Sequence, residues 1–277
     1  MRSILSYMLL FCLAAFWSSC HPKLASQHAT VAGREAVQEA AVASSPNTIV
    51  NQEAKDDHGN LVLLGKCTRE RLEQAPFDSW FVKNYEAYRV DSATADLLRP
   101  KLAGKQFRIF MGTWCGDSRR EVPRIYKIFD YCGVERSSIQ LIMVSSVDSM
   151  YKQSPGHEER GLNIFRVPDL LVTDHKKEVG RIVESPVVSL EKDLLVLAGG
   201  GSYTPNYKGA AFLAGYFREK RTEDMEKELP GLADRLRPLL SSPSELNSYA
   251  HVLQAAGEKD RAGIALKLNS MIFPASK

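Results

Sequence analysis

The segment Thr113-Trp114-Cys115-Gly116-Asp117-Ser118 lies at the junction of two different patterns. Before it, residues 106–111 (QFRIFM) form a short apolar run that predicts a strand. After it, residues 118–131 carry apolar side chains at helical spacing, with Pro123 marking a kink or the early turns. The segment therefore predicts a tight turn from a strand into a helix, with Cys115 where the helix begins.

A cysteine in this position is a candidate nucleophile. Free backbone N–H groups and the helix dipole at a helix N-terminus favour the thiolate over the thiol. The thiolate is the species that attacks a disulfide. We therefore predict that Cys115 is an attacking thiol, and the other interpretation is an inert, partly buried cysteine.

The patterns around this turn predict an α/β layer over residues 101–200. An apolar run at 140–145 is typical of a buried strand in a parallel sheet. Runs that contain apolar residues at 169–173 and 178–184, with a turn between them, predict a hairpin, and 190–198 predicts a closing helix. The order strand, helix, strand, hairpin, helix predicts a mixed sheet flanked by helices.

Helical extensions are predicted on both sides of this layer. In residues 61–100, Thr68 is a candidate helix N-cap, and residues 92–98 predict a short helix closed by Pro100. Between them an aromatic face recurs at helical spacing and either packs on the core or forms a wall of a ligand site. Its members are Phe77, Trp80, Phe81, Tyr85 and Tyr88.

The C-terminal region, 201–277, has the spacings of one helical hairpin. Its pattern resembles a single tetratricopeptide unit, and no second copy follows. Since such units need neighbours, we expect this one to pack on the preceding domain or on a helix at 231–240; a partner-docking surface is the alternative. The residues that carry the pattern are Leu246, Tyr249, Ala250, Leu253, Gly257, Ala262, Leu266 and Pro274.

The N-terminus reads as a targeting segment. Arg2 precedes an apolar run at 4–16, and small residues then lead to Cys20. Residues 1–20 thus resemble a bacterial lipoprotein signal in which Cys20 is lipidated; an ordinary secretory signal and a retained anchor are the alternatives. Residues 21–60 are small and polar and predict a flexible tether. We expect a periplasm-facing lipoprotein of the bacterial cell envelope, anchored to a membrane by its lipid.

Composition excludes several classes of function. The net charge of +3 is too small to indicate a nucleic-acid partner. The cysteines show neither CxxC pairing nor a histidine at ligand spacing, so we expect no metal site. Gly199-Gly200-Gly201 lacks the following Lys-Ser or Lys-Thr pair of a phosphate-binding loop. We expect no cofactor.

Three motifs, on the expected elements and in the expected order, resemble the thioredoxin superfamily over roughly residues 101–200. They are Trp114-Cys115-Gly116 at the turn, Pro123 in the helix, and Arg166-Val167-Pro168 before the hairpin. The longer pattern around the turn is similar to thioredoxin-family lipoproteins of Gram-negative bacteria. The resemblance implies a thioredoxin-like sheet, a cis peptide bond at Val167–Pro168, and thiol–disulfide chemistry with protein thiols or disulfides as partners.

Two departures from that family change the expected chemistry. Ser118 stands where the family has its second cysteine, so a disulfide cycle within the motif is ruled out. Ile109 stands where the family has a buried carboxylate, so the internal proton acceptor is missing. We predict Cys115 and Ser118 as the catalytic residues, with the Ser118 hydroxyl available to donate a hydrogen bond to the thiolate. The predicted supporting residues are Trp114, Gly116, Asp117, Val167 and Pro168.

Asp117 has two opposing influences around it. Its negative charge disfavours the thiolate, whereas the positive charges of Arg119 and Arg120 favour it. Cys132 lies across the helix, on the order of 20 Å from Cys115, too far for a disulfide. Cys67 remains a candidate resolving thiol, and a Cys67–Cys132 pair or two buried thiols are the alternatives.

These residues support competing functions. The first is a monothiol thiol–disulfide oxidoreductase or isomerase that forms mixed disulfides resolved by an external thiol. The second is a non-catalytic binding or scaffold module in which Cys115 is incidental. Peroxidase chemistry fits poorly because Gly112, rather than threonine, lies three residues before the cysteine.

Overall fold

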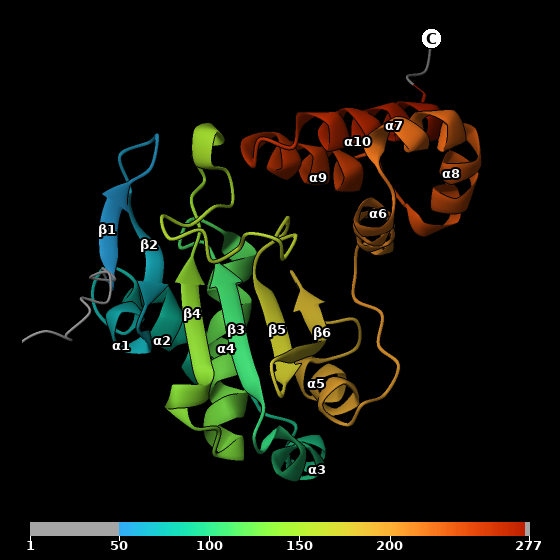
Figure 1. Cartoon of the computed structure of the whole chain (residues 1–277). Coiled ribbons are helices and arrows are strands. Elements are labelled where there is room, and N and C mark those ends of the chain that lie inside the picture. Colours follow the sequence, from blue (N-terminus) through green and yellow to red (C-terminus); the bar gives the residue numbers. More distant parts are fainter. Residues whose placement is uncertain (1–49, 275–277) are drawn as a thin grey trace, which may run out of the picture. The chain divides into compact units, whose positions relative to one another are not determined.

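The computed structural model describes residues 50–274 and contains one six-stranded mixed sheet. The predictions for the signal peptide, for lipidation of Cys20 and for the tether up to residue 49 fall outside the described residues. The strands run in the order β1-β2-β4-β3-β5-β6 across the sheet (Figure 1). They are β1 (Gln52–Lys55), β2 (Leu61–Cys67), β3 (Gln106–Met111), β4 (Ile139–Met143), β5 (Asp169–Asp174) and β6 (Lys177–Val183).

The directions of the strands place the Cys115 turn at one edge of the sheet. β3 and β4 are parallel, and Met111 at the end of β3 lies opposite Met143 at the end of β4. β5 runs antiparallel to β3, so it begins where β3 ends, with Asp169 opposite Phe110. β6 is antiparallel to β5. The turn after β3, the loop after β4 and the entry to β5 therefore converge at this edge.

The N-terminal part of the sheet corrects the sequence prediction. Residues 52–55 fall in the predicted tether and 61–67 in the predicted helical extension, yet they form the antiparallel pair β1–β2. β2 also pairs antiparallel with β4. The physical reason is the apolar run of residues 61–64, which buries Val62 and Leu63, preceded by a turn in which Gly59 adopts φ +80°.

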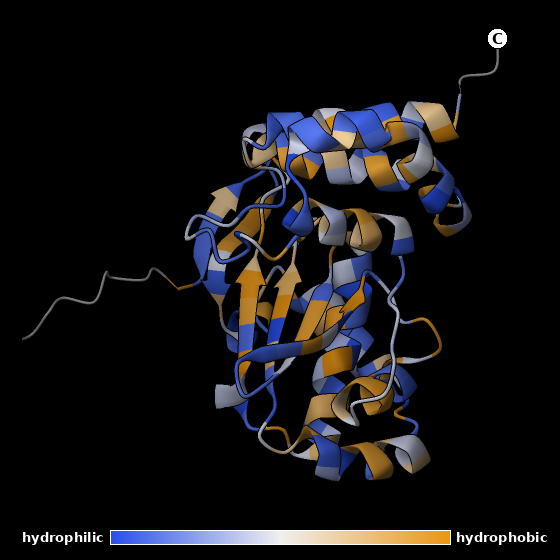
Figure 2. Cartoon of the chain, turned by 45° about the vertical axis from the view of Figure 1, so that its right-hand side comes forward, coloured by the Kyte–Doolittle hydropathy of each residue, from blue (hydrophilic) through white to orange (hydrophobic). Residues whose placement is uncertain are grey.

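The helices of the sheet region are α1 (Arg69–Leu72), α2 (Asp78–Ala87), α3 (Ser92–Leu102), α4 (Gly116–Cys132) and α5 (Leu190–Ala198). In Figure 1, α4 lies behind β3 and β4. Ile109 and Met111 point to the larger core, which also holds Ile125 and Phe129 of α4. Phe110 points to the opposite face, where a smaller core includes Ile164 of the loop after β4. The central strands are thus buried on both faces, and they are largely hydrophobic (Figure 2).

Pro100 does not end its helix as the sequence suggested, and Pro123 lies inside a helix as predicted. α3 continues through Pro100 to Leu102, four residues past the predicted end. α4 runs through Pro123, which cannot donate to the carbonyl oxygen of Arg119 four residues earlier. Asn84 of α2 donates its side-chain Nδ2 to that oxygen at 3.1 Å. A neighbouring helix thus supplies the hydrogen bond that Pro123 lacks.

The C-terminal region is helical, as predicted. It contains α6 (Lys208–Glu219), α7 (Thr222–Met225), α8 (Leu229–Leu236), α9 (Ser244–Ala255) and α10 (Lys259–Ile272), with α9 and α10 packed as a hairpin. Its hydrophobic core includes Tyr249 and Leu253 of α9, and also Phe165 and Val183 from the sheet region. The C-terminal helices therefore share a core with the loop that leads into β5. Between residues 50 and 274, no helix has the length and apolar character needed to cross a membrane.

Candidate functional site

Cys115 is the N-cap residue of the 17-residue helix α4 and is partly exposed. Its backbone is extended, its N–H donates to the Gly112 carbonyl oxygen at 3.0 Å, and its own carbonyl oxygen accepts from the Arg119 N–H at 3.0 Å. The Sγ atom donates to the Val167 carbonyl oxygen at 3.3 Å. The Val167–Pro168 peptide bond is cis. The structure thus brings Cys115, Val167 and Pro168 together from distant parts of the sequence.

The residues just before Cys115 hold the turn rigid. Trp114 donates its indole Nε1 to the Val144 carbonyl oxygen at 2.9 Å. Thr113 is buried, and its Oγ1 accepts from the Leu63 N–H of β2 at 3.3 Å. At Gly112 a Cβ atom would lie 2.4 Å from the Trp114 ring, so no larger residue fits without a shift of that ring. The turn therefore depends on β2 as well as on β3 and β4.

Ser118 bonds to the backbone of the turn, and its hydrogen bond to the Cys115 thiolate stays a prediction. It is fully buried, and its Oγ accepts a hydrogen bond from the Gly112 N–H at 3.4 Å. The serine closes the turn from inside, because it lies one helical turn along α4 from Cys115 and faces the sheet. Ile109 is fully buried in the larger core, so that position holds no carboxylate.

The charges next to Cys115 are paired on the surface of α4. Asp117 forms an ion pair with Arg120 at 2.7 Å. Arg119 instead donates to the Thr113 carbonyl oxygen at 2.5 Å and lies over the Trp80 ring. Of the two arginines considered from sequence, Arg120 is therefore the one that balances Asp117. Gly116, the first residue of α4, is exposed and leaves the start of the helix open.

Three residues near the Cys115 turn were missed from sequence. They are Tyr151 and Lys152 in the loop after β4 and Glu184 just after β6, and they lie near Arg166 of the predicted Arg166-Val167-Pro168 motif. Lys152 is 5% exposed and donates its Nζ to the Phe165 carbonyl oxygen at 2.6 Å. Arg166 pairs with Glu184 at 3.3 Å. The loop reads as an ordinary polar connection, so no local motif identifies these residues.

Burial and neighbouring charge shift the pKa of two of these groups. Burial, followed by the nearby positive charge of Arg166, lowers the pKa of Lys152 to about 8, while Cys115 and Glu184 act in the opposite direction. Burial raises the pKa of Glu184, and the Arg166 charge opposes this. Tyr151 and Lys152 each interact electrostatically with Cys115, Arg166 and Glu184.

Cys67 and Cys132 lie away from the site. Both are free thiols, as is Cys115. Leu63 of β2 contacts Thr113 of the Cys115 turn. Cys67 lies four residues beyond Leu63 on the same strand, which separates the two residues by about 13 Å along β2. Burial raises the pKa of Cys67 to about 12. Cys132 ends α4, about 25 Å from its start, and burial raises its pKa too. Neither is placed to resolve a disulfide at Cys115, which needs Cα atoms within roughly 7 Å.

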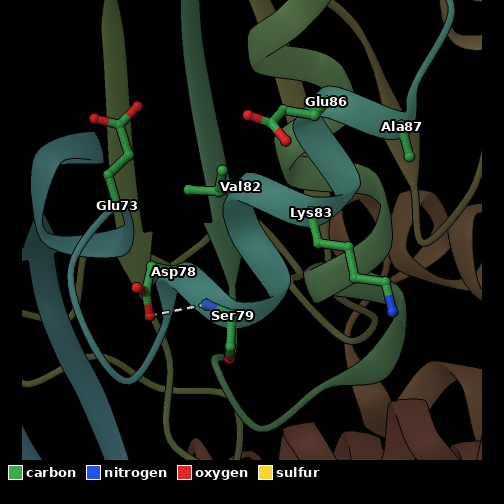
Figure 3. Close-up of a pocket in the computed structure, with 7 residues that line it drawn as sticks. All are labelled: Glu73, Asp78, Ser79, Val82, Lys83, Glu86 and Ala87. Carbon is green, nitrogen blue, oxygen red and sulfur yellow. Dashed lines mark hydrogen bonds between the residues drawn. The ribbon is translucent and has the colours of Figure 1, made fainter.

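Two other hollows are lined by residues that do not include Cys115. A hollow of about 680 Å³ lies over α2, and Figure 3 shows Asp78, Lys83 and Glu86 spread around this helix with Val82 among them. It contains no cysteine or histidine. A cavity of about 450 Å³ between the loop after β4 and α9 is lined by residues that include Lys152. Among residues 50–274, no group of three or more His, Cys, Asp or Glu side chains is arranged to hold a metal ion.

No protein-family model matches the sequence, and no curated protein matches it. Two solved structures resemble part of the chain. A protein of unknown function from Pseudomonas aeruginosa is 19% identical, with 46% of this chain and 74% of that chain covered and a TM-score of 0.30. An HIV epitope-scaffold is 20% identical, with 46% and 78% covered and a TM-score of 0.29. At these TM-scores neither likeness bears on fold or function.

Proposed function

We propose that the chain is a thioredoxin-like protein in which Cys115 is the single attacking thiol of thiol–disulfide exchange. The observation that carries the proposal is the position of Cys115 as the N-cap residue of the 17-residue helix α4, beside the segment of Val167 and Pro168. A helix N-terminus favours the thiolate, the nucleophile of the reaction. The partly exposed sulfur is open to a substrate.

The arrangement of elements supports the thioredoxin-like scaffold. The parallel strands β3 and β4 are joined through α4, and the antiparallel strands β5 and β6 follow with α5 after them. The cis bond before Pro168 lies beside the cysteine, as the resemblance implies. The antiparallel pair β1–β2, which joins the sheet through β4, and the C-terminal helices are extensions of that scaffold.

The chemistry is an exchange in two steps. The Cys115 thiolate attacks one sulfur of a substrate disulfide, forms a mixed disulfide and releases the other sulfur as a thiolate, which takes a proton from water. A second, external thiolate then attacks the mixed disulfide, releases Cys115 and leaves with the substrate sulfur. An external thiol is needed because Ser118 has no sulfur and Cys67 and Cys132 lie too far from Cys115. The proposed partners are therefore protein disulfides or thiols.

The alternative function is a non-catalytic binding or scaffold module. The observation in its favour is that α10 exposes Leu266 and Met271, two apolar side chains on the C-terminal hairpin. In this alternative Cys115 is incidental and the helical hairpin docks a partner. The proposed setting, a membrane-anchored envelope lipoprotein, rests on the sequence before residue 21.

Mixed-disulfide formation tests the proposal. We expect oxidised glutathione to form one mixed disulfide per chain, located at Cys115 by peptide mass spectrometry, and reduced glutathione to release it. The Cys115→Ala variant should form none, whereas Cys132→Ala, the matched control, should behave as the wild type. Failure of the folded wild type to form a mixed disulfide at Cys115 would favour the binding module.

A further inference from the structure

The buried lysine beside the candidate nucleophile has no assigned role. We infer that Lys152 is a positioning residue for Cys115, whose ammonium group, held by the Phe165 carbonyl oxygen, is the charge partner of the Cys115 thiolate. This inference rests on the proposed function and names a residue that tunes the same sulfur.

The geometry comes from one short segment of backbone. Lys152 Nζ donates to the Phe165 carbonyl oxygen at 2.6 Å, and Cys115 Sγ donates to the Val167 carbonyl oxygen at 3.3 Å. Residues two apart have Cα atoms at most about 7 Å from each other. Segment 165–167 therefore holds both the ammonium group and the sulfur, on carbonyl oxygens two residues apart, and the two groups interact electrostatically.

Lys152 lacks a carboxylate partner. It is 5% exposed, and it forms no ion pair with any carboxylate in the part of the chain from 50 to 274. Glu184, the nearby carboxylate, pairs with Arg166 instead. An ammonium group has three donors, and Phe165 accepts from one. A buried charge without a counter-charge is costly, so an anion that forms nearby is strongly stabilised by it.

The thiolate of Cys115 supplies the negative charge that Lys152 lacks. The Val167 carbonyl oxygen accepts a hydrogen bond from the thiol and so favours the protonated form of Cys115. Ile109 stands where the related family has a carboxylate, so that device is missing. The positive charge of Lys152 acts in the opposite sense to Val167 and favours the thiolate.

The other charged groups around Lys152 have defined positions. Arg166 lies on the segment that leads to Pro168, and Glu184 follows β6 and pairs with it. The Lys152 Nζ lies 5.0 Å from the centre of the Tyr151 ring. From α9, His251 stacks on Tyr151 with ring centres 4.1 Å apart. Asp117 is paired with Arg120 and Arg166 with Glu184, so Lys152 is the cation of this loop that interacts with the sulfur without a carboxylate partner.

Alkylation kinetics with charge variants test the inference. The rate of iodoacetamide reaction at Cys115 is measured against pH in the wild type, Lys152→Met and Lys152→Arg. We expect Lys152→Met to lower the rate at pH 7 about tenfold and to move the pH profile upward, since one nearby charge changes a pKa by roughly one unit or more. Lys152→Arg should restore the rate to within about threefold of the wild type. Lys83→Met, at an exposed lysine of α2, is the matched control and should change nothing.

A reciprocal measurement avoids any change at Lys152. The pKa of Lys152 is followed by NMR of ¹³C-labelled lysine in the wild type and in Cys115→Ala. Coupling between two sites is mutual, so we expect a lower Lys152 pKa when the sulfur is removed. An unchanged Lys152 pKa in Cys115→Ala would overturn the inference, even if Lys152→Met fails to fold.

The outcomes separate the inference from the proposed function. A wild-type Cys115 that reacts no faster than in the unfolded chain overturns both. If Cys115 is alkylated rapidly in the wild type and equally rapidly in a folded Lys152→Met variant, only the role of Lys152 is overturned. Rapid alkylation of Cys115 in the wild type, slow alkylation in Lys152→Met and a restored rate in Lys152→Arg support both the inference and the proposed function.

Discussion

At the scale of single residues, the site consists of the Cys115 sulfur, two backbone carbonyl oxygens and the buried ammonium group of Lys152. The Val167 oxygen accepts from Cys115, and the Phe165 oxygen accepts from Lys152. Cys115, Val167 and Pro168 could be predicted because motif spacing marks them. Tyr151 and Lys152 could not, because a long polar loop carries no periodicity that fixes which side chain turns inward.

The Ser118→Ala variant tests what the buried hydroxyl contributes to the turn. The Ser118 hydroxyl accepts from the Gly112 N–H and is fully buried, so Ser118→Ala leaves that donor unpaired. We expect a loss of about 1 kcal/mol in the free energy of unfolding, measured by urea denaturation. The alkylation rate of Cys115 should stay within about twofold of the wild type. A large loss of alkylation rate without loss of stability would restore the hydroxyl as a partner of the thiolate.

Lys152 predicts a specific dependence of stability on pH. Its pKa is about 8 in the folded protein and 10.5 when unperturbed, so between these values the unfolded chain binds more protons. The free energy of unfolding therefore rises with pH across this window, by at most about 3 kcal/mol from this group. Urea denaturation of the wild type and of Lys152→Met at pH 7.5 and 10 isolates the contribution. Equal pH dependence in the two proteins would contradict the buried ammonium.

At the scale of elements, the pattern of residues 101–200 predicted the observed order of strands and helices. Strong periodicity fixed α4 and α5, and the hairpin of β5 and β6 followed from its turn. The pair β1–β2 was missed because β1 is polar and short, and it becomes a strand only through pairing with β2. The continuation of α3 through Pro100 was also missed, whereas the helical spacing of residues 118–131 predicted a helix that includes Pro123.

The hydrogen bond from Asn84 to the Arg119 carbonyl oxygen makes the continuity of α4 testable. In Asn84→Ala the oxygen that Pro123 leaves unpaired loses its donor from α2. We expect a loss of about 1 kcal/mol in the free energy of unfolding. Lys83→Ala, one residue earlier and exposed, is the control that should cost less. An unchanged stability in Asn84→Ala would mean that water satisfies the oxygen equally well.

At the scale of the whole molecule, the C-terminal helices and the site loop share packing. Phe165 and Val183 belong to the core of the C-terminal helices. Arg166, two residues before Pro168, donates to the Ser244 carbonyl oxygen at 3.4 Å and lies over Tyr207. The sequence predicted a helical hairpin packed on its neighbours, but not that the contact reaches the loop beside Cys115. Contacts between distant segments leave no trace in local periodicity.

Tyr249 tests this shared core. It is 1% exposed, its ring lies 5.5 Å from that of Phe165, and its hydroxyl donates to Asn163 at 3.3 Å. We expect Tyr249→Ala to lower the free energy of unfolding by about 3 kcal/mol or more, as for other large buried aromatic residues. Gln254→Ala, at an exposed position of α9, is the control. A loss in Tyr249→Ala no greater than in the control would show that the C-terminal helices fold independently of the site loop.

The most direct test of the central claim is the pH profile of Cys115 alkylation, resolved by peptide mass spectrometry, in the folded protein and in urea. A nucleophilic cysteine at the start of α4 should react at least about tenfold faster at pH 7 in the folded chain, with its profile moved to lower pH. Cys67 and Cys132 should react only in urea, because they are buried. A Cys115 profile that is the same in both states, or slower in the folded chain, would contradict the claim that Cys115 is an attacking thiol.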